Sequence, residues 1–114
     1  MENDKKPFVK DANELEKRLV ESMGYCLATD RIMVEGAKIS YMYRKTPDEE
    51  SDSGWRFFAG DEEEEYLENP NNIGLYDINT IAHYDQSIIP FLTSDYNTSF
   101  YRNEENIFEE EPFE

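Results

Sequence analysis

The chain has 114 residues, a length that fits one domain with a single modest core. It carries 27 acidic residues against 11 basic ones, for a formal net charge of -16, and such a surface repels the phosphates of nucleic acids and anionic lipids. Aromatic residues make up 14% of the sequence, more than a disordered acidic chain would carry, so we expect a folded domain. The charge favours a basic partner, although a solubility surface with no partner would look the same.

Cysteine usage and hydropathy bear on the compartment. Cys26 is the only cysteine, so no intrachain disulfide can form. Residues 1–10 lack the apolar run of a signal peptide, and no stretch approaches the roughly 20 apolar residues of a membrane span. We therefore expect a cytoplasmic protein that binds neither nucleic acid nor membrane.

The first predicted element is a helix over residues 11–23, which follows a polar segment, 1–10, expected to be a flexible end. Asp11 and Glu14 have the spacing of a capping box, and Gly24 is a natural C-terminal stop. Leucine, valine and methionine side chains recur between them at helical spacing.

Strands are predicted next, over residues 25–29, 39–44 and 54–60, with a turn at Glu35-Gly36 after the first. The segment 54–60 has apolar side chains on both faces, which indicates an interior strand covered by a helix on at least one side. The residues expected in the structural core are Tyr41, Trp55, Arg56 and Phe57. Arg44 and Arg56 are expected to pair with carboxylates.

The C-terminal half predicts short helices. Asp61 and Glu64 again have capping-box spacing and would open an acidic helix through about Glu68. Asp77 is placed to cap a helix over 78–84, and residues 85–92 indicate a further helical turn interrupted by Pro90. Residues 99–102 are expected to be an edge strand, and 103–114 a flexible end. The order of elements predicts one α+β domain, 1–114, with a mostly antiparallel sheet, an N-terminal helix and short C-terminal helices.

Catalytic and metal-binding candidates are weak. His83 has no specific partner in the sequence, and Cys26 lies in an apolar run where a free cysteine behaves as a small hydrophobe. The acidic run 61–65 lacks the alternate ligand spacing and glycine turn of a calcium loop. We expect no catalytic residue, no cofactor and no metal.

Two stretches carry a family resemblance. They are Tyr41-Met-Tyr-Arg44 with Thr46-Pro-Asp48, and Asp52-Ser-Gly-Trp-Arg-Phe-Phe-Ala-Gly-Asp-Glu62 with Asn72-Ile-Gly-Leu-Tyr-Asp-Ile-Asn79. Over about residues 26–102 the chain resembles a small bacterial family, once described only as a domain of unknown function and now grouped as immunity protein family thirty-three. The resemblance implies a cytoplasmic protein that neutralises a cognate toxin of a polymorphic toxin system.

The acidic surface is the predicted contact with such a partner. Its candidate residues are Asp48, Glu49, Glu50, Asp52, Asp61, Glu62, Glu63, Glu64 and Glu65. Carboxylates on a surface can occlude a basic cleft and speed association through electrostatic steering. The alternative is a small enzyme or ligand-binding domain with a pocket lined by Asp and Tyr side chains. The sequence leaves the oligomeric state open.

Overall fold

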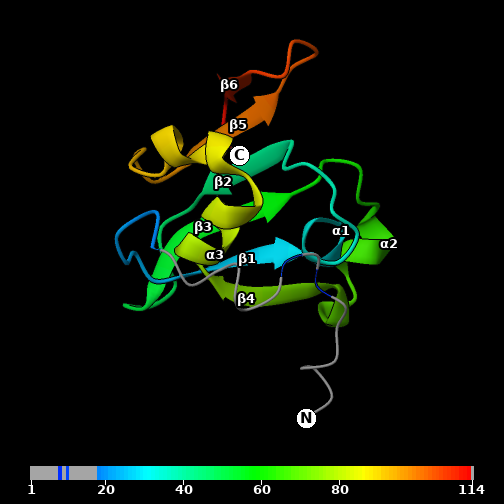
Figure 1. Ribbon diagram of the computed structural model, residues 1–114, viewed down its shortest axis with the longest axis horizontal. Coiled ribbons are helices and arrows are strands. Elements are labelled where there is room, and N and C mark those ends of the chain that lie inside the picture. Colours follow the sequence, from blue (N-terminus) through cyan, green and yellow to red (C-terminus); the bar gives the residue numbers. More distant parts are fainter. Residues whose placement is uncertain (1–7, 9, 11–17, 114) are drawn as a thin grey trace.

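The computed structural model of the chain describes residues 8, 10 and 18–113. Within them, six strands form one sheet in the order β4-β1-β3-β2-β5-β6 (Figure 1). The strands are β1 Tyr25–Thr29, β2 Tyr41–Arg44, β3 Asp52–Phe58, β4 Ile73–Asp77, β5 Thr98–Arg102 and β6 Phe108–Glu111. β1 and β3 are parallel, while the other four neighbouring pairs are antiparallel, so the sheet is mixed and mostly antiparallel.

Short helices accompany the sheet. They are α1 Asp30–Met33, α2 Glu64–Leu67, the 3-10 turn η3 Pro70–Asn72, α3 Ile78–Tyr84, and the 3-10 turn η4 Gln86–Phe91. Figure 1 shows α3 in front of the sheet, and α1 and α2 at one end of it. The predicted helix after Asp77 and the turn containing Pro90 are confirmed, and Asp77 accepts a hydrogen bond from the Asn79 amide as a cap does. No helix within the described residues is long and apolar enough to cross a membrane.

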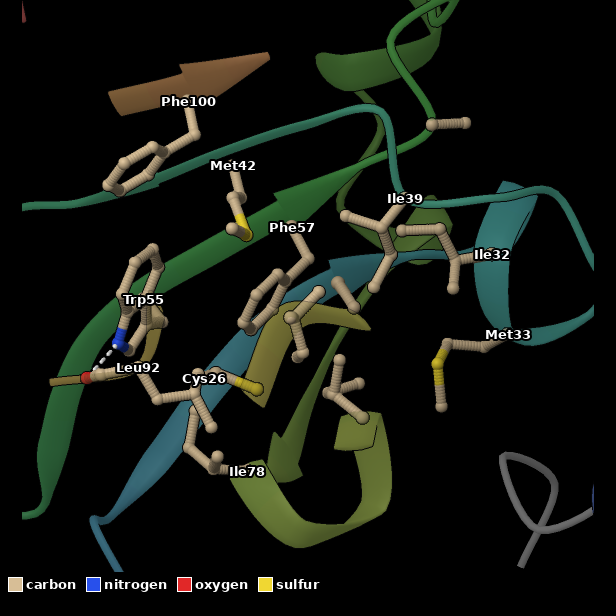
Figure 2. Packing of buried hydrophobic residues seen from close by; sticks show 14 of the residues in the cluster. Cys26, Ile32, Met33, Ile39, Met42, Trp55, Phe57, Ile78, Leu92 and Phe100 are labelled. Atoms are coloured by element: carbon tan, nitrogen blue, oxygen red, sulfur yellow. Dashed lines mark hydrogen bonds between the residues drawn. The ribbon is translucent and has the colours of Figure 1, made fainter. Parts of the chain in front are cut away.

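The core lies between the sheet and the layer formed by α3 and η4. Trp55 and Phe57 point into it from β3, and their rings stack with centroids 5.7 Å apart. Figure 2 shows the Trp55 indole turned toward Leu92, whose carbonyl oxygen accepts a hydrogen bond from Nε1 at 3.1 Å. The remaining fully buried side chains around them include Cys26, Ile32, Met33, Ile39, Met42, Ile78, Ile81 and Ile88. The interior position predicted for the Trp55 strand is confirmed, because β3 lies between β1 and β2.

Several predicted elements differ from the observed ones. The capping-box residues and most of the predicted helix at 11–23 lie outside the described residues, and residues 18–23, which are described, form no helix. After β1 the chain forms α1, which was not predicted, and then turns at Gly36. β5 is not an edge strand, because residues 108–111 of the expected flexible end pair with it as β6. β4 was not predicted.

The two faces of the sheet differ in burial. Side chains on the α3 face, such as Trp55, Phe57 and Met42, are fully buried, whereas those pointing the other way from the same strands are mostly half-buried or exposed. Tyr41, expected in the core, is half-buried on this second face, opposite Phe58 in the register of β2 and β3. The open face, as we name it, carries the side chains of Leu27, Tyr41, Tyr43, Phe58, Leu75 and Tyr101.

Candidate binding surface

The sequence Asp52-Ser-Gly-Trp-Arg56 begins β3 and builds a buried ion pair. The two carboxylate oxygens of Asp52 accept from Arg56 Nη1 at 3.0 Å and Nη2 at 2.9 Å, so the predicted pairing of Arg56 is confirmed. The same oxygens also accept from the amides of Gly54 at 2.8 Å and Asp48 at 2.9 Å. The bonds to Arg56 in particular hold the pKa of Asp52 far below its usual range.

Gly54 makes this arrangement possible. Its φ of +90° lies in the left-handed region, and a Cβ at this position would come within 2.3 Å of the Lys45 carbonyl oxygen. The pairing of β1 with β3 shifts register at the same place, so that Tyr25 faces Asp52 and Leu27 faces Arg56. The sequence from Asp52 to Arg56 therefore bends β3, and this bend brings the Asp52 carboxylate within bonding distance of Arg56, four residues later in the chain.

Arg44 behaves differently from Arg56. Its guanidinium donates to the carbonyl oxygens of Ser53 at 2.9 Å and Ser94 at 2.8 Å, and lies 4.7 Å from the centre of the Tyr96 ring. Among the described residues it forms no ion pair, so the predicted carboxylate partner of Arg44 is wrong. Carbonyls satisfy it because β2 places Arg44 on the core face, across from Trp55, where the chain leaving η4 passes.

The open face has an aromatic centre. The Phe58 ring lies 5.8 Å from the rings of both Tyr41 and Tyr43, and Tyr43 is also 5.8 Å from Phe113 near the C-terminal end. Toward the sheet edges, Tyr101 is 37% exposed and Leu75 is 63% exposed. Exposed aromatic and apolar side chains gathered on one face are typical of a protein-binding surface.

Hollows lie along this face, and the described residues line at least three of them. One is about 590 Å³ and is bordered by Tyr41, Phe58, Leu67 and Tyr101, with Asp61 and Glu62 beside them. A second, of about 410 Å³, lies between Tyr41, Tyr43, Lys45 and Phe113. A third, of about 140 Å³, is lined in part by Leu27, Tyr43 and Phe58. The face is therefore both apolar and hollowed.

The first acidic cluster is divided by the structure. Asp61 forms a two-bond ion pair with Arg31, at 3.0 and 2.6 Å, and Arg31 holds its pKa below the usual range. Glu62 is half-buried and accepts from the Thr29 hydroxyl at 2.6 Å and from the amides of Ala59 at 2.7 Å and Gly60 at 2.9 Å. The predicted cap of Asp61 on the helix is wrong, because α2 begins only at Glu64, after Glu63, which makes no side-chain cap. Glu63, Glu64 and Glu65 are exposed.

The second acidic cluster, in the loop before β3, also has mixed roles. Asp48 pairs with Lys45 at 2.8 Å, and Glu49 accepts from the Tyr25 hydroxyl at 2.8 Å and raises the Tyr25 pKa to about 12. Glu50 is exposed, whereas Asp52 is buried beneath the loop and presents no surface to a partner. The exposed acids of the two clusters thus lie at opposite ends of β3, with the open face between them.

The catalytic candidates are not brought together as a site. Cys26 is fully buried in the core, and burial raises the pKa of its thiol, which keeps the thiol protonated and a poor nucleophile. His83 lies on α3, on the other side of the sheet from the open face, and is not among the residues that line the hollows described above. In the described part of the chain, no three His, Cys, Asp or Glu side chains are grouped in a way that could hold a metal ion.

The residues that sequence reasoning missed are those of the open face. Tyr41 and Tyr43 alternate along the predicted strand 39–44, so the sequence indicates that they share a face. The alternation does not indicate which face of the sheet the helices cover. Tyr101 and Phe113 fell in segments predicted as an edge strand and a flexible end.

A comparison with known protein families matches most of this chain. Residues 26–111 match the family model described as the Immunity protein Imm33 domain, a match that spans β1 to β6. No curated protein and no solved structure matches the chain. The match covers most of the sequence, including the Asp52–Arg56 ion pair and the open face. The chain therefore belongs to the Imm33 immunity protein domain family.

Proposed function

We propose that this protein binds a cognate bacterial toxin in the cytoplasm and neutralises it by covering a basic surface of that toxin. The observation that carries the proposal is the family match over residues 26–111, because an immunity domain acts on a protein partner. The function proposed is binding and not catalysis.

The charge distribution supports a basic partner. The chain has a formal net charge of -16, and Glu50, Glu63, Glu64 and Glu65 are exposed at the two ends of β3. None of these four has a basic side chain bonded to it within the described residues. Uncompensated carboxylates raise the association rate with a basic protein, and salt with a screening length of about 8–10 Å weakens that effect.

The contact that we propose combines charge with apolar surface. The exposed acids would steer the encounter, while the open face between them would supply the desolvated centre of the interface. Asp52, Asp61 and Glu62 are left out of the steering set, because they hold the fold through Arg56, Arg31 and backbone amides respectively.

The test begins with identifying the partner. Tagged protein is cross-linked in cells of the source organism, and the captured toxin candidate is then expressed alone and together with this chain. We expect the candidate to arrest growth when expressed alone and the pair to grow normally. A captured protein that is harmless alone, or whose toxicity this chain does not relieve, would contradict the proposal.

The acidic contribution has its own matched test. Glu63→Gln with Glu65→Gln changes the formal net charge from -16 to -14, and so does the control pair Asp95→Asn with Glu110→Gln, two exposed acids away from the open face. In stopped-flow measurements at low salt, the first pair should slow association with the toxin by roughly two- to tenfold, and the control by much less. Equal effects of the two pairs would show that only net charge matters, and no effect of either would remove the acidic surface from recognition.

A further inference from the structure

The geometry points to the hollow of about 590 Å³ on the open face as a binding site for an arginine side chain of the basic partner. The inference rests on the proposed function, because that function supplies the protein partner. It goes further in naming the group that enters and the walls that receive it.

The hollow has the walls that a flat cation needs. Tyr41, Phe58 and Tyr101 border it with aromatic rings, Leu67 closes it from α2, and its volume of about 590 Å³ is within the range of ligand pockets. The Tyr41 and Phe58 rings are tilted by 39° to each other, so they form two sides of a hollow and not one flat wall. The negative faces of such rings attract a guanidinium.

Glu62 supplies an uncompensated negative charge in the hollow. Its three described partners are a hydroxyl and two backbone amides, all neutral donors, so its charge is held in position but not cancelled. A carboxylate offers about four acceptor positions, and three bonds leave one for an incoming donor. The charge of Asp61, in contrast, is already balanced by Arg31.

One base also borders the hollow, and it is already bonded. The Arg102 guanidinium donates to Asp85 at 2.6 Å and to the Ile39 carbonyl at 2.6 and 2.9 Å, on the core side of the sheet, where it lies over the Phe108 ring. Its charge is therefore balanced by Asp85, which does not line the hollow. The same pair of features, a ring face and an oxygen acceptor, holds Arg102 itself in place.

Arginine fits this hollow better than lysine. The planar guanidinium stacks on aromatic rings, is weakly hydrated and donates in a fixed fork, whereas the lysine ammonium is compact and strongly hydrated. An arginine entering between the rings can stack on them while one N–H reaches Glu62.

The experiment uses a capped tripeptide, acetyl-Gly-Arg-Gly-amide, titrated into the full protein and followed by amide NMR shifts. The matched probe replaces arginine with citrulline, which has almost the same shape and no charge. We expect saturable shifts at the amides of Phe58, Gly60 and Tyr101, and clearly weaker binding of the citrulline peptide. Tyr101→Ala should weaken arginine-peptide binding by about two- to fivefold, and Tyr101→Phe should preserve it.

Tyr96→Ala is the matched control, because Tyr96 is a similarly exposed tyrosine that packs on Arg44 instead of facing the hollow. It should leave binding unchanged. Equal binding of the citrulline peptide would overturn the inference and indicate a neutral ligand, as a small-molecule pocket would. Shifts confined to other surfaces, or no saturable shift up to roughly 50 mM peptide, a range suited to weak single-residue contacts, would also overturn it.

The growth assay separates this inference from the proposed function. If the protein relieves toxicity but Tyr101→Ala relieves it equally and the peptide does not bind, the arginine seat is wrong and the immunity function stands. If the peptide binds as described but no toxin is relieved, the immunity function is wrong while the recognition chemistry of the hollow stands.

Discussion

Replacing Asp52 with Asn, which exchanges one carboxylate oxygen for an NH₂ group, should strongly destabilise the fold. The Asp52 carboxylate is buried and accepts four hydrogen bonds, two from Arg56 and one each from the amides of Asp48 and Gly54. Four bonds use all of its acceptor positions. An asparagine keeps one oxygen and turns an NH₂ group toward donors, so about two of those donors lose their partner, and the buried guanidinium loses its counter-charge.

The expected loss of stability is large on the scale of a small domain. Breaking one partner of a buried ion pair costs about 3–5 kcal/mol, against a total stability of about 5–15 kcal/mol. With a urea m-value of about 2 kcal/mol/M, the unfolding midpoint should fall by about 1.5–2.5 M. Glu35→Gln is the control, because its exposed pair with Arg31 is worth only about 0–1 kcal/mol.

The pH dependence provides a second readout. The folded pKa of Asp52 is depressed below its unfolded value of about 3.9, so its contribution is fully present above pH 4 and is lost as the pH falls through the folded pKa. The stability gap between the native protein and Asp52→Asn should therefore narrow below pH 4, by up to about 1.4 kcal/mol per pH unit. A loss under about 1 kcal/mol at pH 7, or a gap that stays constant from pH 6 to 3, would refute the reasoning.

Three further predictions concern the core, the Glu62 bonds and metals. Trp55→Ala should cost about 3–5 kcal/mol in chemical denaturation, because the indole is fully buried and its Nε1 bonds Leu92; a loss under about 1 kcal/mol would contradict its burial. Glu62→Ala should cost about 1–3 kcal/mol, whereas the exposed neighbour change Glu63→Ala should cost about 0.5 kcal/mol or less, and equal losses would argue against a structural Glu62. Thermal unfolding with and without EDTA should superimpose, and a clear drop in Tm with the chelator would indicate a bound metal.

Local signals explain which elements the sequence could predict. β1, β2 and β3 are short runs of β-forming residues, and Asp77 caps α3 through a bond two residues away, so the information for each lies within the segment itself. The ion pair of Arg56 was also predictable as a pairing, although its partner four residues back depends on a bend that only Gly54 allows.

Long-range pairing explains what was missed. β6 has the acidic sequence Phe-Glu-Glu-Glu, which favours no strand by itself and becomes one by pairing with β5 across the turn formed by Asn103 and Asn106. β4 contains Gly74 and an exposed Leu75, and its strand form depends on β1 beside it. The open face follows from where α3 and η4 pack, which no single strand specifies. The contact residues of any partner were beyond prediction for the same reason.

The bend at Gly54 also means that the residues that hold the fold and the residues that meet solvent are different sets in this small domain. The residues from Asp52 to Arg56 hold β3 in shape. The charges of Asp52 and Arg56 balance each other in the interior. The tyrosines and glutamates that meet solvent are tied to none of those bonds. Substitutions at Tyr101, Glu63 or Glu65 should therefore change the surface while leaving the scaffold intact. The surface of a domain built in this way can change one residue at a time on an unchanged scaffold.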